Sequence, residues 1–135
     1  MKYLLDTNTC IRHLNQRSEA ITRRLLDTSE TDIAVCSVVK GELFFGTMKS
    51  HSPEKTLLKQ RDFVERFTSL PFDDACAEVY ARIRAELERN GTPIGANDLL
   101  IASIAIANGL TLVTHNISEF RRVAGLQIED WEAGN

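Results

Sequence analysis

Short apolar segments that stop abruptly on polar residues constrain the fold of this chain more than any other feature. Tyr3–Leu5 and residues 110–114 are rich in apolar side chains without strict alternation, which is typical of strands covered on both faces in a parallel sheet. A further strand is expected at residues 33–37, with weaker ones near 70–72 and 126–128. The pattern therefore predicts a buried sheet of short strands.

Helical patterns lie between the expected strands. Glu19–Asp27 and residues 75–89 repeat apolar side chains three and four positions apart, and Pro53 fits the start of another helix that reaches Phe67. Residues 97–108 are apolar nearly all round, which indicates a buried helix. Strands that alternate with helices predict an α/β sandwich with a mostly parallel central sheet.

Length, charge and cysteine usage narrow the class of protein. The 135 residues favour a single domain, 1–135, that is long enough to bury a core. The formal charge of -3 argues against a broad basic surface, although a local basic rim is compatible with it. Cys10, Cys36 and Cys76 are scattered and odd in number, which favours reduced thiols in a cytoplasmic protein. The longest apolar stretch, residues 99–106, is too short to span a membrane.

Asp6 ends the first expected strand, in the segment YLLDTN. Ligands of α/β folds bind outside the carboxyl ends of the strands, and Asp6 occupies such a position. A carboxylate so close to an apolar interior needs a cation, a hydrogen-bond donor or water as its partner. Because Asp is also a favoured N-cap, a purely structural role at the start of a helix near Thr9 explains the residue equally well.

Glu42 is the second acidic candidate, in the segment VVKGELFFG. On a helix, Val38, Glu42 and Phe45 share one face. Glu42 would then interrupt an apolar stripe, where a charge is costly unless it is paired or bound to a metal. The alternative is a glutamate at the rim of the core, or one that forms a salt bridge to Lys49 or another base.

Asp98 is the third acidic candidate, in the segment GTPIGANDLLIA. The glycines and the proline predict a loop, and Asn97 is a plausible cap of the buried helix that follows. Asp98 then lies in the first helical turn, where the helix dipole favours an anion. This interaction with the helix dipole would also explain Asp98 by itself, without a functional site.

The segment TLVTHN repeats the pattern of a strand that ends in polar residues. Because side chains alternate along a strand, Thr114 and Asn116 point together while His115 points away. Pairing of this strand with the first one would bring Asn116 near Asp6. His115 is expected to be an exposed loop residue rather than a ligand.

These acids are more informative together than singly. Clustered carboxylates repel one another and raise one another's pKa. A hard divalent cation resolves this conflict, and carboxylate and amide oxygens without Cys or His suit Mg²⁺, or Mn²⁺ as the alternative. Phosphoryl transfer is the chemistry that such a site serves best.

Four segments resemble the signature segments of PIN-domain proteins and, more narrowly, of the VapC toxins of bacterial VapBC toxin–antitoxin pairs. They are LLDTN, KGELFFG, GTPIGANDLLIA and LTLVTHNISEFRRVAGLQIEDW. The resemblance covers almost the whole chain, and the segments come in the order of the family. It implies a PIN-like three-layer α/β/α sandwich and an Mg²⁺-dependent endoribonuclease that cleaves a tRNA or another structured RNA. It also implies a cognate VapB-type antitoxin and a homodimer.

The resemblance assigns roles to individual residues. Asp6, Glu42 and Asp98 match the acidic site residues of the family, with Asp6 and Asp98 as direct metal ligands and Glu42 binding the metal or orienting water. Asn116 takes the place of a further Asp that the family often carries. The residues expected to support this site are Thr7, Asn8 and Thr114. The candidates for contacts with RNA phosphates are Arg12, Lys40, Lys49, Arg82, Arg84, Arg121 and Arg122.

Other enzyme classes fit the first strand less well. A haloacid-dehalogenase-type phosphatase needs a second acid two residues after the first, where this chain has Asn8. A receiver domain needs an early acidic pair and a later Lys, and a phosphate-binding Rossmann module needs a Gly-rich first turn. The remaining alternative is a catalytically silent PIN-like module that binds RNA or a partner.

Overall fold

The centre of the molecule is a five-stranded sheet in which all neighbouring strands are parallel, as seen in a computed structural model that describes residues 1–133. The strands are ordered β3-β2-β1-β4-β5. Their bounds are β1 (Tyr3–Leu5), β2 (Ile33–Cys36), β3 (Thr68–Leu70), β4 (Thr111–Val113) and β5 (Ile128–Glu129). The predicted α/β class is confirmed. The last two residues of the expected domain, 134 and 135, lie outside the described residues.

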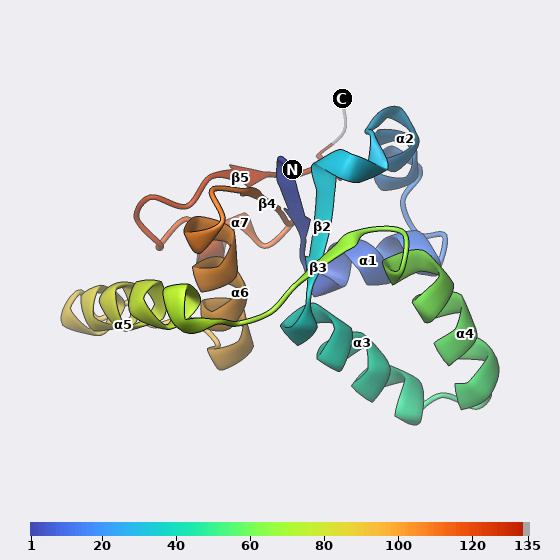
Figure 1. The fold of residues 1–135 in the computed structure, drawn as a ribbon, viewed down its shortest axis with the longest axis horizontal. Coiled ribbons are helices and arrows are strands. Elements are labelled where there is room, and N and C mark those ends of the chain that lie inside the picture. Colours follow the sequence, from blue (N-terminus) through green and yellow to red (C-terminus); the bar gives the residue numbers. More distant parts are fainter. Residues whose placement is uncertain (134–135) are drawn as a thin grey trace.

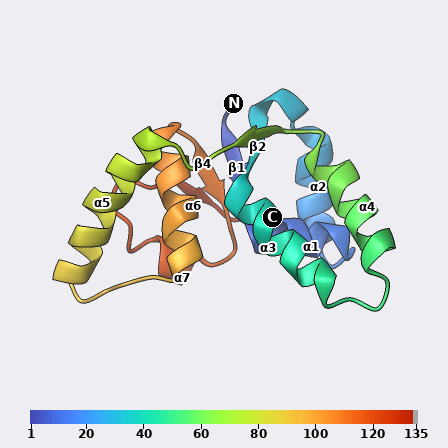
Figure 2. The ribbon, with the colours of Figure 1, turned by 60° about the horizontal axis from the view of Figure 1, so that its bottom comes forward.

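Helices cover both faces of the sheet. Figures 1 and 2 show the first four helices on one side and the last three on the other. The helices are α1 (Thr7–Leu14), α2 (Glu19–Asp27), α3 (Ser37–Met48), α4 (Pro53–Val64), α5 (Asp74–Arg89), α6 (Ala96–Ala107) and α7 (Ile117–Phe120), with a short 3₁₀ turn at Glu30–Asp32. None of the helices within residues 1–133 is long and apolar enough to cross a membrane.

The strand order creates a switch point between β1 and β4. From β1 the chain adds β2 and β3 on one side of the sheet, then crosses back and adds β4 and β5 on the other. Since crossovers between parallel strands are right-handed, this reversal places the two sets of helices on opposite faces. Ligands of such sheets bind at the carboxyl ends of the strands beside the switch point. The fold therefore predicts a site just after β1 and β4.

The core makes this end of the sheet rigid. All four residues of β2 are buried, and so are Leu4 and Leu5 of β1. The predicted buried helix is confirmed as α6, which has six buried residues and packs against α5, α3 and β4. Each large apolar side chain buried in this way contributes about 1.5–3 kcal/mol. The acidic residues Asp6, after β1, and Asp98, at the start of α6, are thus held by well-packed elements.

Two strands differ in position from the sequence expectation. The third strand ends at Leu70 instead of continuing to residue 72, because Pro71 has no N–H to donate to the ladder. The last strand begins at Ile128, later than the expected residues 126–128. Gly125 there has a φ of 85°, and Leu126 N–H bonds back to Val123 O at 3.4 Å. A turn therefore occupies the residues expected to start that strand.

Thr9 connects α1 to β4 across the switch point. Its backbone N–H donates to Asp6 Oδ1 at 2.8 Å, and its hydroxyl donates to Val113 O at 3.1 Å. The backbone N–H of Asp6 donates to the same carbonyl at 3.1 Å. Because Thr9 is buried, no water can replace a missing hydrogen bond at low cost.

We expect Thr9→Val to lower the free energy of unfolding by about 1 kcal/mol, since it keeps the shape of the side chain and removes one buried hydrogen bond. The measurement is urea denaturation, in which the midpoint should fall while the m-value stays unchanged. Thr68→Val, at an exposed position of β3, is the control and should change stability by less than about 0.5 kcal/mol. Equal midpoints for Thr9→Val and wild type would contradict the prediction.

Candidate functional site

Asp6 is buried at the carboxyl end of β1 and also caps α1. Its carboxylate accepts hydrogen bonds from Thr9 N–H at 2.8 Å and from the hydroxyl of Thr114. Burial raises the pKa of Asp6 above its ordinary value, the two threonines lower it, and the charge of Glu42 raises it. The capping role considered from the sequence is confirmed, although α1 begins at Thr7, two residues earlier than expected.

Glu42 lies on α3, where two neutral donors hold its carboxylate. Thr7 Oγ1 donates to Glu42 Oε1, and Asn97 Nδ2 donates to Glu42 Oε2 at 3.1 Å. The considered salt bridge to Lys49 is absent, because that ammonium lies 4.4 Å from the centroid of the Phe45 ring. Glu42 therefore forms no ion pair among residues 1–133.

The expected apolar stripe around Glu42 is wrong in detail. The buried face of α3 consists of Val39, Leu43 and Thr47, whereas Phe45 is 64% exposed. A side chain one position earlier than Leu43 is rotated by about 100° around the helix. Glu42 therefore lies at the edge of the buried face, where it reaches α1 and α6.

Asp98 lies in the first turn of α6, as expected, but the cap of this helix differs from the expectation. Gly95 is the N-cap, so Asn97 lies inside the helix and its side chain binds Glu42. The backbone N–H of Gly95 donates to Glu119 Oε1 at 2.9 Å. The loop before α6 therefore joins Asp98 to an acidic residue of α7.

The carboxyl groups of Asp98 and Glu119 interact directly. The pKa of Asp98 is raised to about 7, first by burial, then by its hydrogen bond to Glu119, and then by the charges of Glu119, Glu42 and Asp6. The hydrogen bond from Asp98 in turn lowers the pKa of Glu119. Because the charges of three other carboxylates raise the pKa of Asp98, the four acidic residues form one electrostatic cluster.

Sequence reasoning missed Glu119. It lies on α7, a helix of four residues that is too short to show an apolar period. A local signal was present, since Asn116 is the N-cap of α7 and Glu119 is its third residue, which matches the spacing of a capping box. The Asn116 amide donates to Glu119 Oε2 at 2.8 Å.

The neighbouring strand end holds this cluster together. The expected pairing of β1 with β4 is confirmed, with Leu5 opposite Val113. Thr114 therefore lies beside Asp6, and its hydroxyl also accepts the backbone N–H of Asn116 at 3.0 Å. The side chain of Asn116 binds Glu119 rather than Asp6. Asn8 is exposed in the first turn of α1.

Some of the basic residues considered for contacts with RNA phosphates already contact other residues of the protein, and others do not. Arg12 pairs with Glu132, Arg84 contacts Tyr80 and Glu88, and Arg122 donates to Pro93 O at 3.0 Å in the loop before α6. Lys49 covers Phe45. The candidates that form neither an ion pair nor any of these other contacts within residues 1–133 are Lys40, Arg82 and Arg121.

The donor set of the cluster fits a hard divalent cation. It consists of carboxylate oxygens and the amide of Asn116, and the nearby thiols of Cys10 and Cys36 have raised pKa values because they are buried. Within residues 1–133 no three acidic, His or Cys groups are already arranged around one point. Mg²⁺ tolerates this, since it keeps several waters and needs only one or two carboxylates.

Comparisons with known proteins agree with this geometry. The PIN domain family matches residues 3–126. The tRNA(fMet)-specific endonuclease VapC of Salmonella typhimurium is 42% identical, covering 97% of this chain and 98% of that protein. Ribonuclease VapC2 of Rickettsia felis is 41% identical, covering 98% and 99%.

Solved structures give the same result. The crystal structure of DNA-bound VapBC from Salmonella typhimurium superposes with a TM-score of 0.90 at 42% identity, covering 97% of this chain and 98% of that one. VapBC-1 from nontypeable Haemophilus influenzae superposes with a TM-score of 0.87 at 31% identity, covering 97% and 98%.

We expect Asp98→Asn to stabilise the metal-free protein at pH 8 and to have little effect at pH 5. The raised pKa of Asp98 means that the folded state holds its proton more tightly than the unfolded state. The resulting stabilisation is complete below about pH 4 and is lost as the pH rises through about 7. Because the carboxyl is only half-buried, the gain at pH 8 should be about 1 kcal/mol.

The measurement is thermal denaturation in EDTA, where this gain corresponds to a rise of about 4 °C. Asp74→Asn is the matched control, since Asp74 is an exposed first-turn acid of α5. It should lower stability slightly, through the helix dipole, by a similar amount at both pH values. An Asp98→Asn protein that is no more stable than wild type at pH 8 would show that repulsion between Asp98 and the other carboxylates does not destabilise the fold.

Proposed function

Because the chain belongs to the PIN-domain family and, within it, to the VapC ribonucleases, we propose that Asp6, Glu42, Asp98 and Glu119 form its nuclease active site. The chain is a toxin-type endoribonuclease that acts on RNA phosphodiesters. The observation that carries the site assignment is the raised pKa of Asp98, to which the three other acids contribute. Asp6 follows β1 and caps α1, and the other three acids come from α3, α6 and α7.

Nucleases of this class depend on a divalent metal, and we propose Mg²⁺, with Mn²⁺ as the alternative. Asp6 and Asp98 would hold the ion directly, and Glu42 would bind it or orient the attacking water. A bound Mg²⁺ would neutralise phosphate charge and lower the pKa of a water. Glu119 supplies a fourth negative charge, so the neutral Asn116 does not leave the site short of charge.

The chain's own residues prepare in-line attack of water on the phosphodiester, with release of a 5′-phosphate and a 3′-hydroxyl. Asp6 is fixed by Thr9 and Thr114, so it meets the reacting groups without reorganisation. Thr7 and Asn97 fix both oxygens of Glu42. Asn8 borders this turn, and its supporting role stays a prediction.

The substrate is a structured RNA, and the initiator tRNA is the first candidate because a relative with 42% identity is named a tRNA(fMet)-specific endonuclease. Lys40, Arg82 and Arg121 are exposed or half-buried and free to bind phosphates. Arg122 lies beside Glu119, whose pKa its charge lowers. The charge of Arg122 therefore acts on the acidic cluster.

The partner is a VapB-type antitoxin, because the similar solved structures are VapBC complexes. A groove of about 350 Å³ lies between α1, α3 and α4, and Glu42 is one of the residues that line it. It includes Ile11, Leu14 and Leu43. Phe45, Met48 and Leu58 are exposed on α3 and α4, which provides apolar surface for a partner helix.

Two further expectations stay proposals. We propose a cytoplasmic location, supported by three cysteines that are all free and buried. We also propose a homodimer, on the family resemblance and on the apolar side chains that α3 and α4 leave exposed.

Asp6→Asn and Asp98→Asn should each reduce Mg²⁺-dependent RNA cleavage at least about 100-fold, corresponding to about 2.7 kcal/mol of transition-state stabilisation. Asn remains a good N-cap, so Asp6→Asn should keep the fold. The measurement is the cleavage rate of purified protein on labelled initiator tRNA with Mg²⁺ or EDTA. Asp73→Asn is the control, because Asp73 caps α5 in the same way and lies outside the acidic cluster. Wild-type rates for the two site variants would refute the assignment.

Brief expression in a bacterial host distinguishes a nuclease from the alternative, a catalytically silent binding module. A nuclease should arrest growth, create new RNA 5′ ends in a single class of structured RNA, and be neutralised by the antitoxin. The Asp6→Asn variant should do none of this at equal protein level. A silent binding module would give the same RNA 5′ ends with and without expression, for wild type and variant alike.

A further inference from the structure

The C-terminal segment, residues 129–132, is anchored across the sheet. Trp131 is 2% exposed, and its ring meets the Tyr3 ring of β1 edge-on at 5.2 Å between centroids. The guanidinium of Arg24 on α2 lies 4.8 Å from the centroid of the Trp131 ring. Trp131 Nε1 and Arg24 Nη2 both donate to Glu129 Oε1, at 3.0 and 3.1 Å. This segment is therefore a fixed part of the fold.

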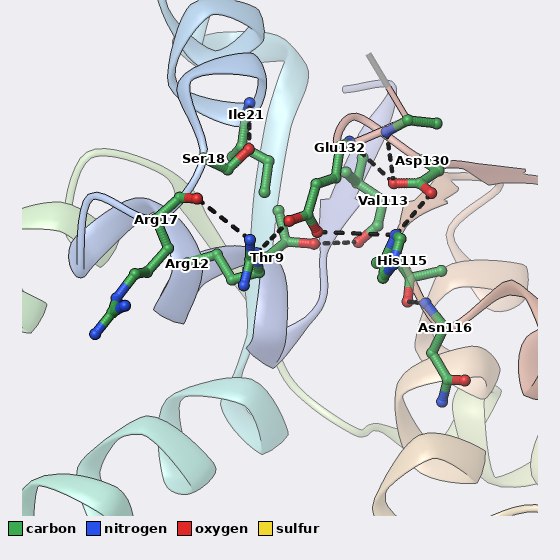
Figure 3. Close-up of polar contacts among 12 residues, drawn as sticks. Thr9, Arg12, Arg17, Ser18, Ile21, Val113, His115, Asn116, Asp130 and Glu132 are labelled. Carbon is green, nitrogen blue, oxygen red and sulfur yellow. Dashed lines mark hydrogen bonds and ion pairs between the residues drawn. The ribbon is translucent and has the colours of Figure 1, made fainter.

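From this anchor, Asp130 and Glu132 reach two elements that carry the site (Figure 3). Asp130 Oδ2 lies 2.9 Å from His115 Nδ1, directly after β4. Glu132 forms an ion pair with Arg12 on α1, and its second oxygen lies 3.8 Å from the same nitrogen of His115. Asp130 Oδ1 also accepts the Glu132 backbone N–H at 2.9 Å, which fixes the two acids relative to each other.

His115 lies between the two residues that hold the acidic cluster. Thr114 binds Asp6, and its backbone N–H donates to Glu129 O at 2.9 Å. Asn116 binds Glu119. The side chain of His115 is 67% exposed and faces Asp130 and Glu132 of the C-terminal segment.

We propose that His115 is a positioning residue of the nuclease site, which rests on the function proposed above. Its Nδ1–H donates to Asp130 Oδ2 and so fixes the three-residue turn from Thr114 to Asn116. Through this turn it sets where Asp6 and Glu119 present their carboxylates. The Arg12–Glu132 pair acts in the same way on α1, whose first turn Asp6 caps.

Loss of this contact should affect catalysis more than stability. An exposed side chain contributes little to the free energy of unfolding, whereas groups that orient metal ligands typically change affinity or activity 10–100-fold. His115→Ala should therefore lower kcat about 10-fold and raise the Mg²⁺ concentration for half-maximal rate, while KM for RNA stays within about 2-fold.

Two conservative variants test which ring nitrogen acts. His115→Asn places an amide N–H near the position of Nδ1 and should restore kcat to within about 3-fold of wild type. His115→Gln places its amide near the position of Nε2 and should behave like His115→Ala. His51→Ala, at an exposed position after α3, is the matched control and should match wild type. All variants are compared by thermal denaturation, so that a folding defect is recognised.

A double-mutant cycle adds a second readout. Asp130→Asn keeps an oxygen for the Glu132 backbone N–H but loses the acceptor that faces His115. Its effect on kcat should not add to that of His115→Ala. The positioning role is overturned if His115→Ala retains the wild-type kcat, if His115→Gln rescues and His115→Asn does not, or if the two effects add.

These outcomes are distinguishable from failure of the proposed function. If wild type shows no Mg²⁺-dependent cleavage that Asp6→Asn removes, the nuclease assignment itself fails. If wild type cleaves, Asp6→Asn does not, and His115→Ala is fully active, only the positioning role fails.

Discussion

The buried carboxylate of Asp6 is the interaction on which the rest of the structure depends. It caps α1 through Thr9 and accepts the hydroxyl of Thr114 after β4. It thereby links the ends of β1 and β4, the two strands between which the direction of strand addition reverses. The charge of Glu42 raises the pKa of Asp6, and the charge of Asp6 in turn raises the pKa of Asp98. The fold thus holds Asp6 in place beside other negative charges.

The acidic cluster is tolerated because neutral donors satisfy its carboxylates. Thr7 and Asn97 satisfy Glu42, while Asn116 and the Gly95 N–H satisfy Glu119. A buried polar group without such partners would cost about 1–3 kcal/mol. The remaining repulsion lowers the stability of the folded chain, which is the usual relation between a functional site and its scaffold.

Much of the fold could be predicted from sequence, because apolar runs and helical periods report burial directly. Glu19–Asp27 was predicted with its observed bounds. Asp6, Glu42 and Asp98 could be recognised as candidates because each lies at the end or in the interior of a recognisable element. Glu119 was missed because α7 is too short for periodicity, and Asn97 was taken for a cap because its contact with Glu42 joins residues 55 positions apart. Such contacts depend on side-chain directions that only the folded chain fixes.

The active geometry is a property of the whole chain rather than of one segment. Thr9 binds Val113 across 104 positions of sequence, and Arg24 binds Glu129 across 105. Contacts of this kind form only when the sheet is complete, so they carry a large loop-closure cost. Loosening of the C-terminal segment alone would free the side chains of Arg12 and His115, while Thr9 and Thr114 would still hold Asp6. The turn after β4 should therefore lose its support at an early, local stage of unfolding, before the core around α6 opens.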